Sequence, residues 1–285
     1  MMEWWLDKGI DGFRMDVINL VSKDPDLPPG DPEEPLNGQM AHTTDGPRVH
    51  EFVSEMHDRV LAGRDLFTVG ELLGAPMSMA DARRYVTEDG LSTVFHFEHV
   101  LLDRGDHVWQ RRDWALPELK AVFDRWQAGL AESGWNSLYL NNHDQPRQVS
   151  RFGDDGRYRR ESATLLATLL HTLRGTPFVY QGEEVGMTNY PFDSLAEVRD
   201  VDTLRNVEVA RRRGRFASES EVLELVRHRS RDNARTPMQW TDGPNAGFTD
   251  GEPWIPVNPN KDEVNVAAAR ADPDSILHYY RRLIA

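Results

Sequence analysis

The sequence predicts an α/β fold, with a parallel β-sheet and helices packed outside it. Short apolar runs typical of buried strands alternate with helical apolar patterns, several runs end in a carboxylate, and 285 residues suffice for one large domain. The expected strands are 9–17, 66–70, 92–97, 137–140 and 176–180. No internal repeat or low-complexity linker interrupts the chain, so we expect residues 1–285 to hold no second complete domain.

Helical patterns separate the expected strands. Apolar residues in them recur at three- and four-residue spacing, as in Val49, Phe52 and Val53, and Pro47 fits the first position of that helix. The expected helices are 1–8, 47–60, 80–88, 116–131, 160–173 and 275–285, with a charged helical region at 194–232. The loops expected from Pro, Gly, Asp and Asn content are 22–46 and 233–260.

Composition excludes several classes of partner. Lys plus Arg number 33 and Asp plus Glu 47, so the net charge of −14 argues against a nucleic-acid partner. No apolar run approaches the roughly 20 residues of a membrane helix, so no membrane partner is expected. Glu3 and Asp7 interrupt the apolar start, which argues against a signal peptide. The absence of cysteine removes disulfides and thiolate metal ligands and fits a cytoplasmic location.

The first expected strand carries two charges. Because side chains alternate along a strand, Arg14 and Asp16 stand on the same side of it. Two readings remain open at this point. The pair is either a buried salt bridge without further meaning, or a carboxylate that the guanidinium keeps ionised for chemistry.

Three of the expected strands end in or just before an acid: Asp16, Glu71 and Asp144. The carboxyl ends of parallel strands meet at one edge, where α/β proteins bind ligands. A single acid there is usually a cap or a solvated charge, whereas converging carboxylates repel and raise the pKa of at least one. Glycoside hydrolysis needs one protonated and one ionised carboxyl group. Aromatic residues in nearby loops either stack on sugar rings or serve ordinary packing: Phe152, Tyr190, Phe192 and Trp240.

These residues lie in stretches that resemble a known family. GFRMD at 12–16, TVGE at 68–71 and NNHD at 141–144 resemble three signature segments of the alpha-amylase superfamily of glycoside hydrolases, in the family's order. Three further stretches are similar to the oligo-1,6-glucosidase and dextran glucosidase branch. They are GPRVHEF at 46–52, QGEEVGMTNY at 181–190 and ARTPMQW at 234–240.

The resemblance implies a catalytic role for each acid. Asp16 matches the nucleophile that forms a covalent glycosyl-enzyme, and Glu71 matches the general acid that later acts as base. Asp144 matches the carboxylate that stabilises the transition state. The implied reaction retains configuration, and the nucleophile and acid of a retaining enzyme lie about 5 Å apart. The implied substrates are short oligosaccharides such as isomaltose.

The resemblance also implies substrate-binding residues. Arg14 and His143 match residues that position the nucleophile and the terminal glucose, and Arg235 matches an arginine that lines the site. Val17 follows the nucleophile, and Val there resembles enzymes that prefer alpha-1,6 over alpha-1,4 bonds. The resemblance implies no cofactor and no metal in this part of the protein. A structural calcium of the full-length enzyme would fall in segments absent here.

The family fold is a TIM (β/α)8 barrel, and the resemblance places this chain at its strands four to eight. The first three strands and the C-terminal β-sandwich would then be missing, which makes the chain a fragment. Both end strands would present unpaired edges and the layers of the barrel core would be incomplete. We therefore expect the isolated chain to be poorly soluble and poorly active.

Three other functions were weighed. Sucrose isomerases and transglucosidases of the same family carry RLDRD where this chain has LLDRG at 101–105, so two of their charged residues are missing. A non-catalytic glucosidase-like subunit, as in transporter-associated chains, would add a membrane span and commonly lose catalytic acids, whereas all three acids are here. A zinc-protease motif starting at His50 fails because the second histidine is Ser54, which leaves His50 as a helix-surface residue.

Overall fold

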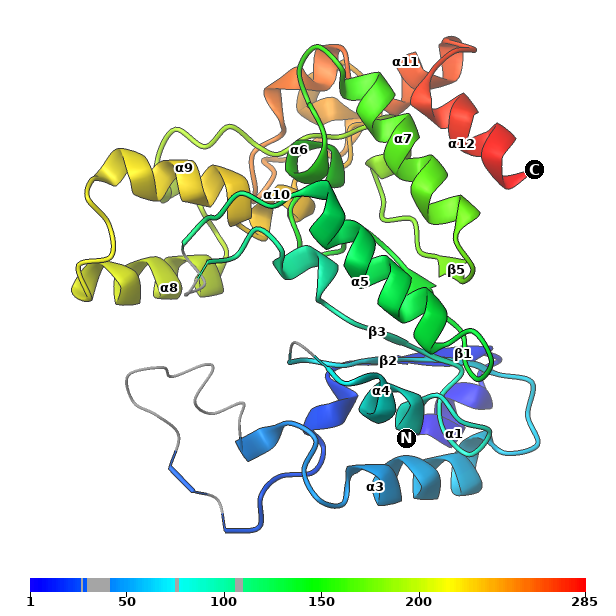
Figure 1. Cartoon of the computed structure of the whole chain (residues 1–285). Coiled ribbons are helices and arrows are strands. Elements are labelled where there is room, and N and C mark those ends of the chain that lie inside the picture. Colours follow the sequence, from blue (N-terminus) through cyan, green and yellow to red (C-terminus); the bar gives the residue numbers. More distant parts are fainter. Residues whose placement is uncertain (27, 30–41, 75–76, 106–109) are drawn as a thin grey trace. The chain divides into compact units, whose positions relative to one another are not determined.

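The computed structural model describes residues 1–26, 28–29, 42–74, 77–105 and 110–285, and the chain forms two compact units (Figure 1). The first unit comprises Met1–Leu102, Trp114–Leu138 and Arg174–Thr176, and the second comprises Asp103–Asp113, Tyr139–Leu173 and Pro177–Ala285. Part of the predicted loop 22–46, namely residues 27 and 30–41, lies outside the described residues.

A three-stranded parallel sheet organises the first unit. Its order is β1 (Gly12–Met15), β2 (Phe67–Glu71) and β3 (Thr93–Phe95), each paired in parallel with the next. Met15 lies opposite Gly70 and Glu71 opposite Phe95, which brings the carboxyl ends of β1 and β2 to one edge. A Cβ on Gly12 would lie 1.8 Å from the Phe67 carbonyl oxygen, so this close approach requires glycine. The prediction of a parallel α/β sheet is confirmed.

The last two strands are shorter than predicted. β4 covers Ser137–Leu138 and β5 covers Thr176–Pro177, where runs of four and five residues were expected. Val94 of β3 forms a parallel bridge with Asn136, and the Thr176 N–H donates to the Asn136 carbonyl at 2.8 Å. Pro177 has no N–H with which to extend a ladder, which is one physical reason why β5 stops there.

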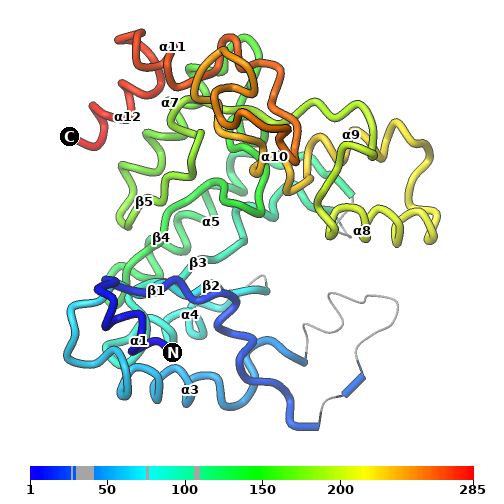
Figure 2. The backbone as a smooth tube through the Cα atoms, turned by 180° about the vertical axis from the view of Figure 1, so that it is seen from behind, coloured from blue at the N-terminus to red at the C-terminus, as the bar shows by residue number. Residues whose placement is uncertain are grey.

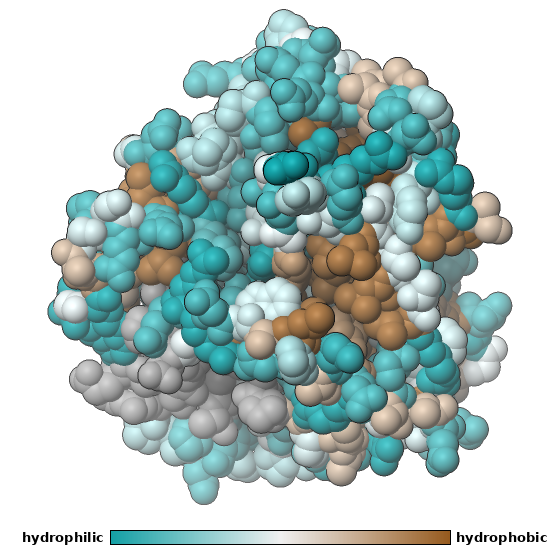
Figure 3. All heavy atoms as spheres, turned by 45° about the horizontal axis from the view of Figure 1, so that its top comes forward, coloured by the Kyte–Doolittle hydropathy of each residue, from teal (hydrophilic) through white to brown (hydrophobic). Residues whose placement is uncertain are grey.

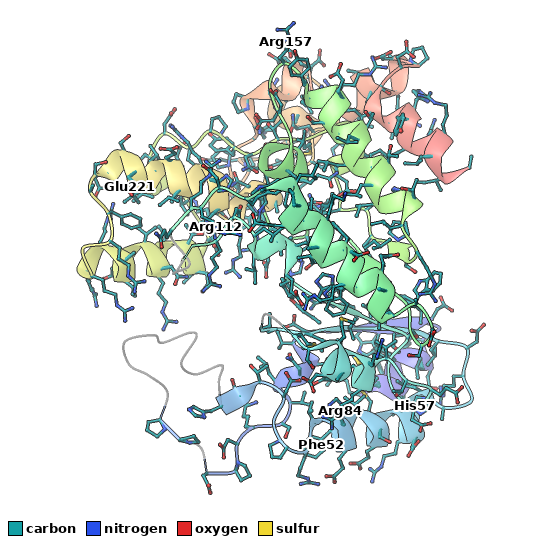
Figure 4. The ribbon with its side chains drawn as sticks, in the orientation of Figure 1. Phe52, His57, Arg84, Arg112, Arg157 and Glu221 are labelled. Atoms are coloured by element: carbon teal, nitrogen blue, oxygen red, sulfur yellow. The ribbon has the colours of Figure 1, made fainter. Side chains whose placement is uncertain are left out.

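The α-helices described in the first unit include α1 (Met2–Leu6), α3 (Val49–Met56), α4 (Met79–Tyr85) and α5 (Leu116–Gly129). Figure 1 and Figure 2 both show α3 and α4 on one face of the sheet, and Figure 4 shows Phe52 and Arg84 there. Helix α3 begins two residues after the predicted Pro47 and continues into a π-helical turn, His57–Leu61. Short 3-10 turns, Ile18–Leu20 and His99–Leu101, follow β1 and β3.

One apolar core unites the sheet and helices of the first unit. Its buried members come from the strands, the helices and the segments between them: Met15, Ile18, Val49, Val53, Leu61, Leu72, Met77, Ala82, Tyr85, Val86, Leu91, Val94, Trp126 and Leu130. Val49 and Val53 are the buried positions of α3, as their helical spacing predicted. His50 is only partly buried and its ring lies 4.6 Å from that of Tyr85, so it is not the plain surface residue expected from the sequence.

The second unit is mainly helical. Its α-helices are α6 (Gln148–Phe152), α7 (Arg159–Thr172), α8 (Val201–Arg212), α9 (Glu219–Arg229), α10 (Asp232–Arg235), α11 (Val266–Ala271) and α12 (Ile276–Ile284). Its 3-10 turns are Glu183–Val185, Leu195–Glu197, Pro244–Gly247 and Pro259–Asp262. The charged region 194–232 thus becomes two main helices, and α6, α10 and α11 were not predicted.

Polar caps set where the helices of the second unit begin. The Ser218 hydroxyl accepts the Glu221 N–H at 3.2 Å at the start of α9, and Glu221, labelled in Figure 4, accepts the Ala217 N–H at 2.8 Å. Asp200 caps α8, and Ser275 caps α12 through the His278 N–H. Such caps stabilise a helix by about 1 kcal/mol each. They explain why a strongly charged stretch still forms ordered helices.

Separate apolar clusters are found among the described residues of the second unit. One lies between α8 and α9 and includes Phe192, Val207 and Val226. Another joins α6, α7 and α12 through residues such as Val149 and Ile276. In a further cluster Val185 and Met187 pack against Met238 and Val264. On the face seen in Figure 3 hydrophilic residues predominate, with apolar residues gathered in patches. No helix in the described ranges is long and apolar enough to cross a membrane.

Candidate active site

The first group of site residues lies at the carboxyl edge of the sheet in the first unit. Asp16 follows β1 directly and Glu71 ends β2. The Arg14 guanidinium bridges them, with Nη1 donating to Asp16 Oδ1 and Nη2 donating to Glu71 Oε2. The predicted placement of Arg14 and Asp16 on one side of the strand is confirmed. The Asp16 side chain is 72% exposed and that of Glu71 9% exposed, so the pair is not simply a buried salt bridge.

The backbone after the first acid is strained. Val17 has φ 41° and ψ 45°, in the left-handed region that β-branched residues rarely enter. Such a conformation is unfavourable by roughly 1–3 kcal/mol and persists only where its surroundings enforce it. The strain therefore sits next to Asp16, at the point where the chain turns away from the sheet.

Asn19 fixes this turn, and only its polar character near the strand end could have indicated this role in advance. Its side chain is fully buried, and its Nδ2 donates to the Leu73 carbonyl at 2.8 Å while its Oδ1 accepts the Leu73 N–H at 3.0 Å. The Asn19 carbonyl also accepts the Asp45 N–H at 2.8 Å. The amide thus ties the segment after Asp16 to the segment after Glu71.

The second group of site residues lies in the second unit. The Asp144 N–H donates to Asn142 Oδ1 at 2.8 Å in a local turn. Arg235 donates from Nη2 to Asp144 Oδ1 and from Nε to the His143 carbonyl at 3.0 Å. His143 Nε2 lies 3.7 Å from Asp144 Oδ2. The structure therefore brings together Asp144, His143 and Arg235, as expected.

A second arginine at this carboxylate was not predicted. Arg231 Nη1 lies 3.6 Å from Asp144 Oδ2. Arg231 precedes Arg235 by four residues across the short helix α10, a spacing that places two side chains on one helix face. That spacing was the signal available in the sequence, but the predicted helical region ends at residue 232 and the predicted loop begins at 233, so the two arginines were not expected on one helix.

A buried arginine, Arg147, binds backbone carbonyls of α10. Arg147 is 1% exposed and donates to three backbone carbonyls, those of Gln181 at 2.7 Å, Asn233 at 3.0 Å and Ala234 at 3.2 Å. Burial lowers the pKa of Arg147 to about 10, so the side chain stays charged at neutral pH. Arg147 therefore anchors the segment that carries Arg235.

The stretch that resembles the isomerase motif contains a buried ion cluster. The Asp103 carboxylate accepts from Arg151 Nε and Nη2 at 2.9 and 2.7 Å, from His228 Nε2 at 3.0 Å and from Arg229 Nη2 at 3.1 Å. Burial alone would raise the pKa of Asp103, but the bond from His228 and the charges of the arginines outweigh it and lower it. Asp103 is thus held in structural contacts within the second unit.

The aromatic candidates have different surroundings. Phe192 is fully buried in the α8–α9 cluster and Tyr190 packs against it at 4.8 Å, so Phe192 serves packing. Trp240 is 48% exposed. Within the described ranges, no group of three or more His, Cys, Asp or Glu side chains could hold a metal ion.

Two groups of predicted residues therefore exist, each inside one unit. Arg14, Asp16 and Glu71, with Val17 beside them, belong to the first unit. Asp144, with His143 and Arg235, belongs to the second. That both groups form one site stays a prediction, as do the roles of the individual residues.

Comparison with known proteins identifies the chain's relatives. The oligo-1,6-glucosidase of Parageobacillus thermoglucosidasius is 53% identical over 287 aligned positions, which cover 100% of this chain and 51% of the relative. The trehalose-6-phosphate hydrolase of Escherichia coli is 46% identical, with 99% of this chain and 50% of the relative covered. A variant of the isomaltulose synthase of Erwinia rhapontici, solved with its natural substrate sucrose, matches with a TM-score of 0.93 at 40% identity, covering 99% of this chain and 51% of that one.

The chain spans about half the length of these relatives. Residues 1–285 match the family described as alpha amylase, catalytic domain, whose fold is a TIM barrel. The expected family and α/β class are thereby confirmed, while the assignment to barrel strands four to eight stays a prediction. The chain belongs to the alpha-amylase family.

Proposed function

We propose that this chain supplies the catalytic acids of a retaining alpha-glucosidase that removes alpha-1,6-linked glucose from short oligosaccharides. One observation carries the proposal: a single guanidinium, that of Arg14, bridges an exposed Asp16 and a buried Glu71 at the carboxyl edge of a parallel sheet. Burial favours the neutral form of a carboxyl group, whereas exposure and the nearby Arg14 charge favour the ionised form, so burial opposes the effect of Arg14 at Glu71 but not at Asp16. The two environments thus suit an acid and a nucleophile.

The proposed reaction has two steps. Glu71 donates a proton to the glycosidic oxygen while an Asp16 oxygen attacks the anomeric carbon, so that the glycosidic bond breaks and a glycosyl ester forms. Glu71, now ionised, takes a proton from water, and the resulting oxygen nucleophile displaces Asp16 and releases glucose with retained configuration. Arg14 keeps the two carboxyl groups in place throughout.

Asp144 is proposed to bind the hydroxyl groups of the same glucose and to stabilise the positive charge of the transition state. Its contacts to Arg235 and its neighbour His143 hold the carboxylate in one orientation. Val17, next to the nucleophile, is proposed to favour alpha-1,6 bonds. The oligosaccharide is the proposed partner, the cytoplasm the proposed location, and no cofactor is invoked.

The names of the relatives support glycoside hydrolysis, and their length suggests that the chain acts as part of a longer protein. Since the chain matches about half of each relative, we propose that it forms the C-terminal part of a catalytic barrel and is poorly active alone. A chimera tests this. The part of the Parageobacillus enzyme that precedes the matched region is joined to residues 1–285, and isomaltose hydrolysis is followed by proton NMR.

The chimera is expected to release alpha-glucose first. The variant Asp16→Asn should abolish turnover, whereas Asp11→Asn, an exposed aspartate just before β1, should leave it unchanged. Inversion of configuration, or full activity of Asp16→Asn, would refute the mechanism. Turnover by the isolated 285-residue chain at the rate of the whole relative would refute the proposed dependence on further segments.

Sucrose isomerisation is the second candidate, because isomaltulose synthases are among the structural relatives. The structure weakens the sequence argument for isomerisation. Asp103 is the acidic residue shared with the isomerase motif, and its carboxylate is bound by Arg151, His228 and Arg229. The same chimera incubated with sucrose separates the two. Isomaltulose or trehalulose as the main product would favour isomerisation, and free glucose would favour hydrolysis.

A further inference from the structure

Asp200 lies behind the two arginines that contact Asp144. Arg231 donates from Nε and Nη2 to Asp200 Oδ1 at 3.0 and 2.7 Å. Arg235 Nη1 lies 3.6 Å from the same oxygen. The Asp200 side chain is 2% exposed. One buried oxygen atom therefore contacts both guanidinium groups, which also contact Asp144.

Asp200 is itself held on its other side. Its Oδ2 accepts from the Thr203 N–H at 3.0 Å and from the Thr203 hydroxyl at 2.6 Å, as the cap of α8. Its own N–H donates to Oδ2 of Asp232, a fully buried residue, at 3.0 Å. These contacts fix the carboxylate on a helix end rather than on a free loop. Fixed groups of this kind orient the residues that they contact.

The negative charge of Asp200 partly compensates the positive charges of Arg231 and Arg235. Burial by itself raises the pKa of Asp200, but hydrogen bonds from Arg231 and Thr203 outweigh burial, and the pKa is lowered. The carboxylate therefore stays ionised at neutral pH. Arg231 and Arg235 lie between two acids, Asp144 on one side and Asp200 on the other.

We propose that Asp200 is a positioning residue for Asp144, because its Oδ1 fixes Arg231 and Arg235 in the arrangement that holds the Asp144 carboxylate. Asp200 contacts no substrate in this scheme and acts only through the two arginines. The proposal rests on the catalytic role proposed for Asp144. Misplacement of a reacting group by about 1 Å lowers a rate by roughly 100-fold, so a change at Asp200 should be visible in turnover.

Two variants separate positioning from folding. Asp200→Asn keeps an oxygen that can cap α8 but removes the charge that binds the guanidinium groups. Asp200→Ser, also a good cap, is used if the first variant does not fold. The matched control is Asp202→Asn, in the same turn of α8, whose carboxylate is 51% exposed and lies 3.6 Å from Arg231 Nη2.

The first measurement does not depend on activity. Nitrogen-15 NMR of the 285-residue chain follows hydrogen exchange at the Arg231 and Arg235 Nε–H groups, assigned with the Lys variants of each. We expect exchange at Arg231 to rise at least about tenfold in Asp200→Asn and to change less than about twofold in Asp202→Asn, because a lost hydrogen bond exposes the proton to water. Unchanged exchange in Asp200→Asn, or equal increases in both variants, would overturn the proposal.

The second measurement is hydrolysis of p-nitrophenyl alpha-glucoside by the chimera described under the proposed function, with the same substitutions. Asp200→Asn should lower kcat by roughly 10- to 100-fold with KM changed less than about threefold, while Asp202→Asn keeps kcat. Unaltered kcat in Asp200→Asn would overturn the positioning role. If the unsubstituted chimera does not hydrolyse the glucoside, the proposed function fails, and the exchange rates alone decide whether Asp200 positions the arginines.

Discussion

The two units hold their acids in different ways. In the first unit the pairing of β1 with β2 sets Asp16 beside Glu71, and one arginine from the strand itself bridges them. In the second unit Asp144 lies outside the strands that the structure describes. Its position follows from loops and short helices that are held by buried charges, among them Arg147 and Asp200. Strand register is thus enough for one group, whereas the other needs a network of side chains.

This difference predicts the largest effect at Arg147 in the second unit. Arg147→Met should lower the free energy of unfolding by about 4 kcal/mol, because the Gln181, Asn233 and Ala234 carbonyls each lose a charged donor. Urea denaturation measures this. The exposed Arg157, labelled in Figure 4, supplies the control, and Arg157→Met should stay within about 0.5 kcal/mol. A loss below about 1 kcal/mol at Arg147 would remove the distinction drawn between the two units.

The corresponding test in the first unit is Arg14→Gln. Loss of the guanidinium leaves two neighbouring carboxyl groups without their shared partner, and kcat/KM of the chimera on isomaltose should fall roughly 100-fold, or about 3 kcal/mol. Arg48→Gln is the matched control, because Arg48 also pairs with an acid, Glu51, but at an exposed helix start. Similar kinetics for the two variants would contradict the role assigned to Arg14.

Asn19 tests whether the turn after β1 needs a side-chain support. Asn19→Leu should lower the free energy of unfolding by about 2 kcal/mol, since both polar groups of Leu73 lose their partners. Asn19→Asp keeps the acceptor for the Leu73 N–H but loses the donor, so an intermediate loss is expected in urea denaturation. Equal stability of all three proteins would show that strand pairing alone suffices.

Glu183 should make the stability of the second unit depend on pH. Burial raises its pKa from 4.5 to about 8, against the opposing effects of the hydrogen bonds at Tyr180 and Tyr280. Between these values the folded carboxyl binds a proton that the unfolded one has lost, so stability should fall as pH rises, by about 1 kcal/mol per pH unit. Thermal unfolding at pH 5 and pH 8 tests this, and Glu183→Gln should flatten the dependence. A rise in stability with pH that depends on Glu183 would contradict the sign.

Val17 is expected to give the smallest effect. Val17→Thr changes little volume, so the proposed preference of the chimera for isomaltose over maltose should fall by roughly tenfold, about 1 kcal/mol, with stability almost unchanged. The ratio of kcat/KM for the two disaccharides measures it. An unchanged ratio would remove Val17 from the specificity proposal.

The comparison also explains what the sequence could foretell. Asp16 and Glu71 end runs with strand periodicity, so their meeting follows from the alternation of side chains and from parallel pairing. The contacts of Arg231 with Asp200, or of Arg147 with Asn233, join residues 31 and 86 positions apart through loops, and no local pattern encodes them. The lengths of β4 and β5 are overestimated from the sequence, because an apolar run indicates burial but not whether its backbone pairs with another strand.

The left-handed conformation of Val17 has a consequence for engineering. Glycine would relieve the local strain, and a selection for heat resistance alone would drift toward it at this position. The gain would come with a looser backbone beside Asp16, the proposed nucleophile, and with loss of the side chain that is proposed to favour alpha-1,6 bonds. Thermal robustness and linkage selectivity are thus set against each other at one residue.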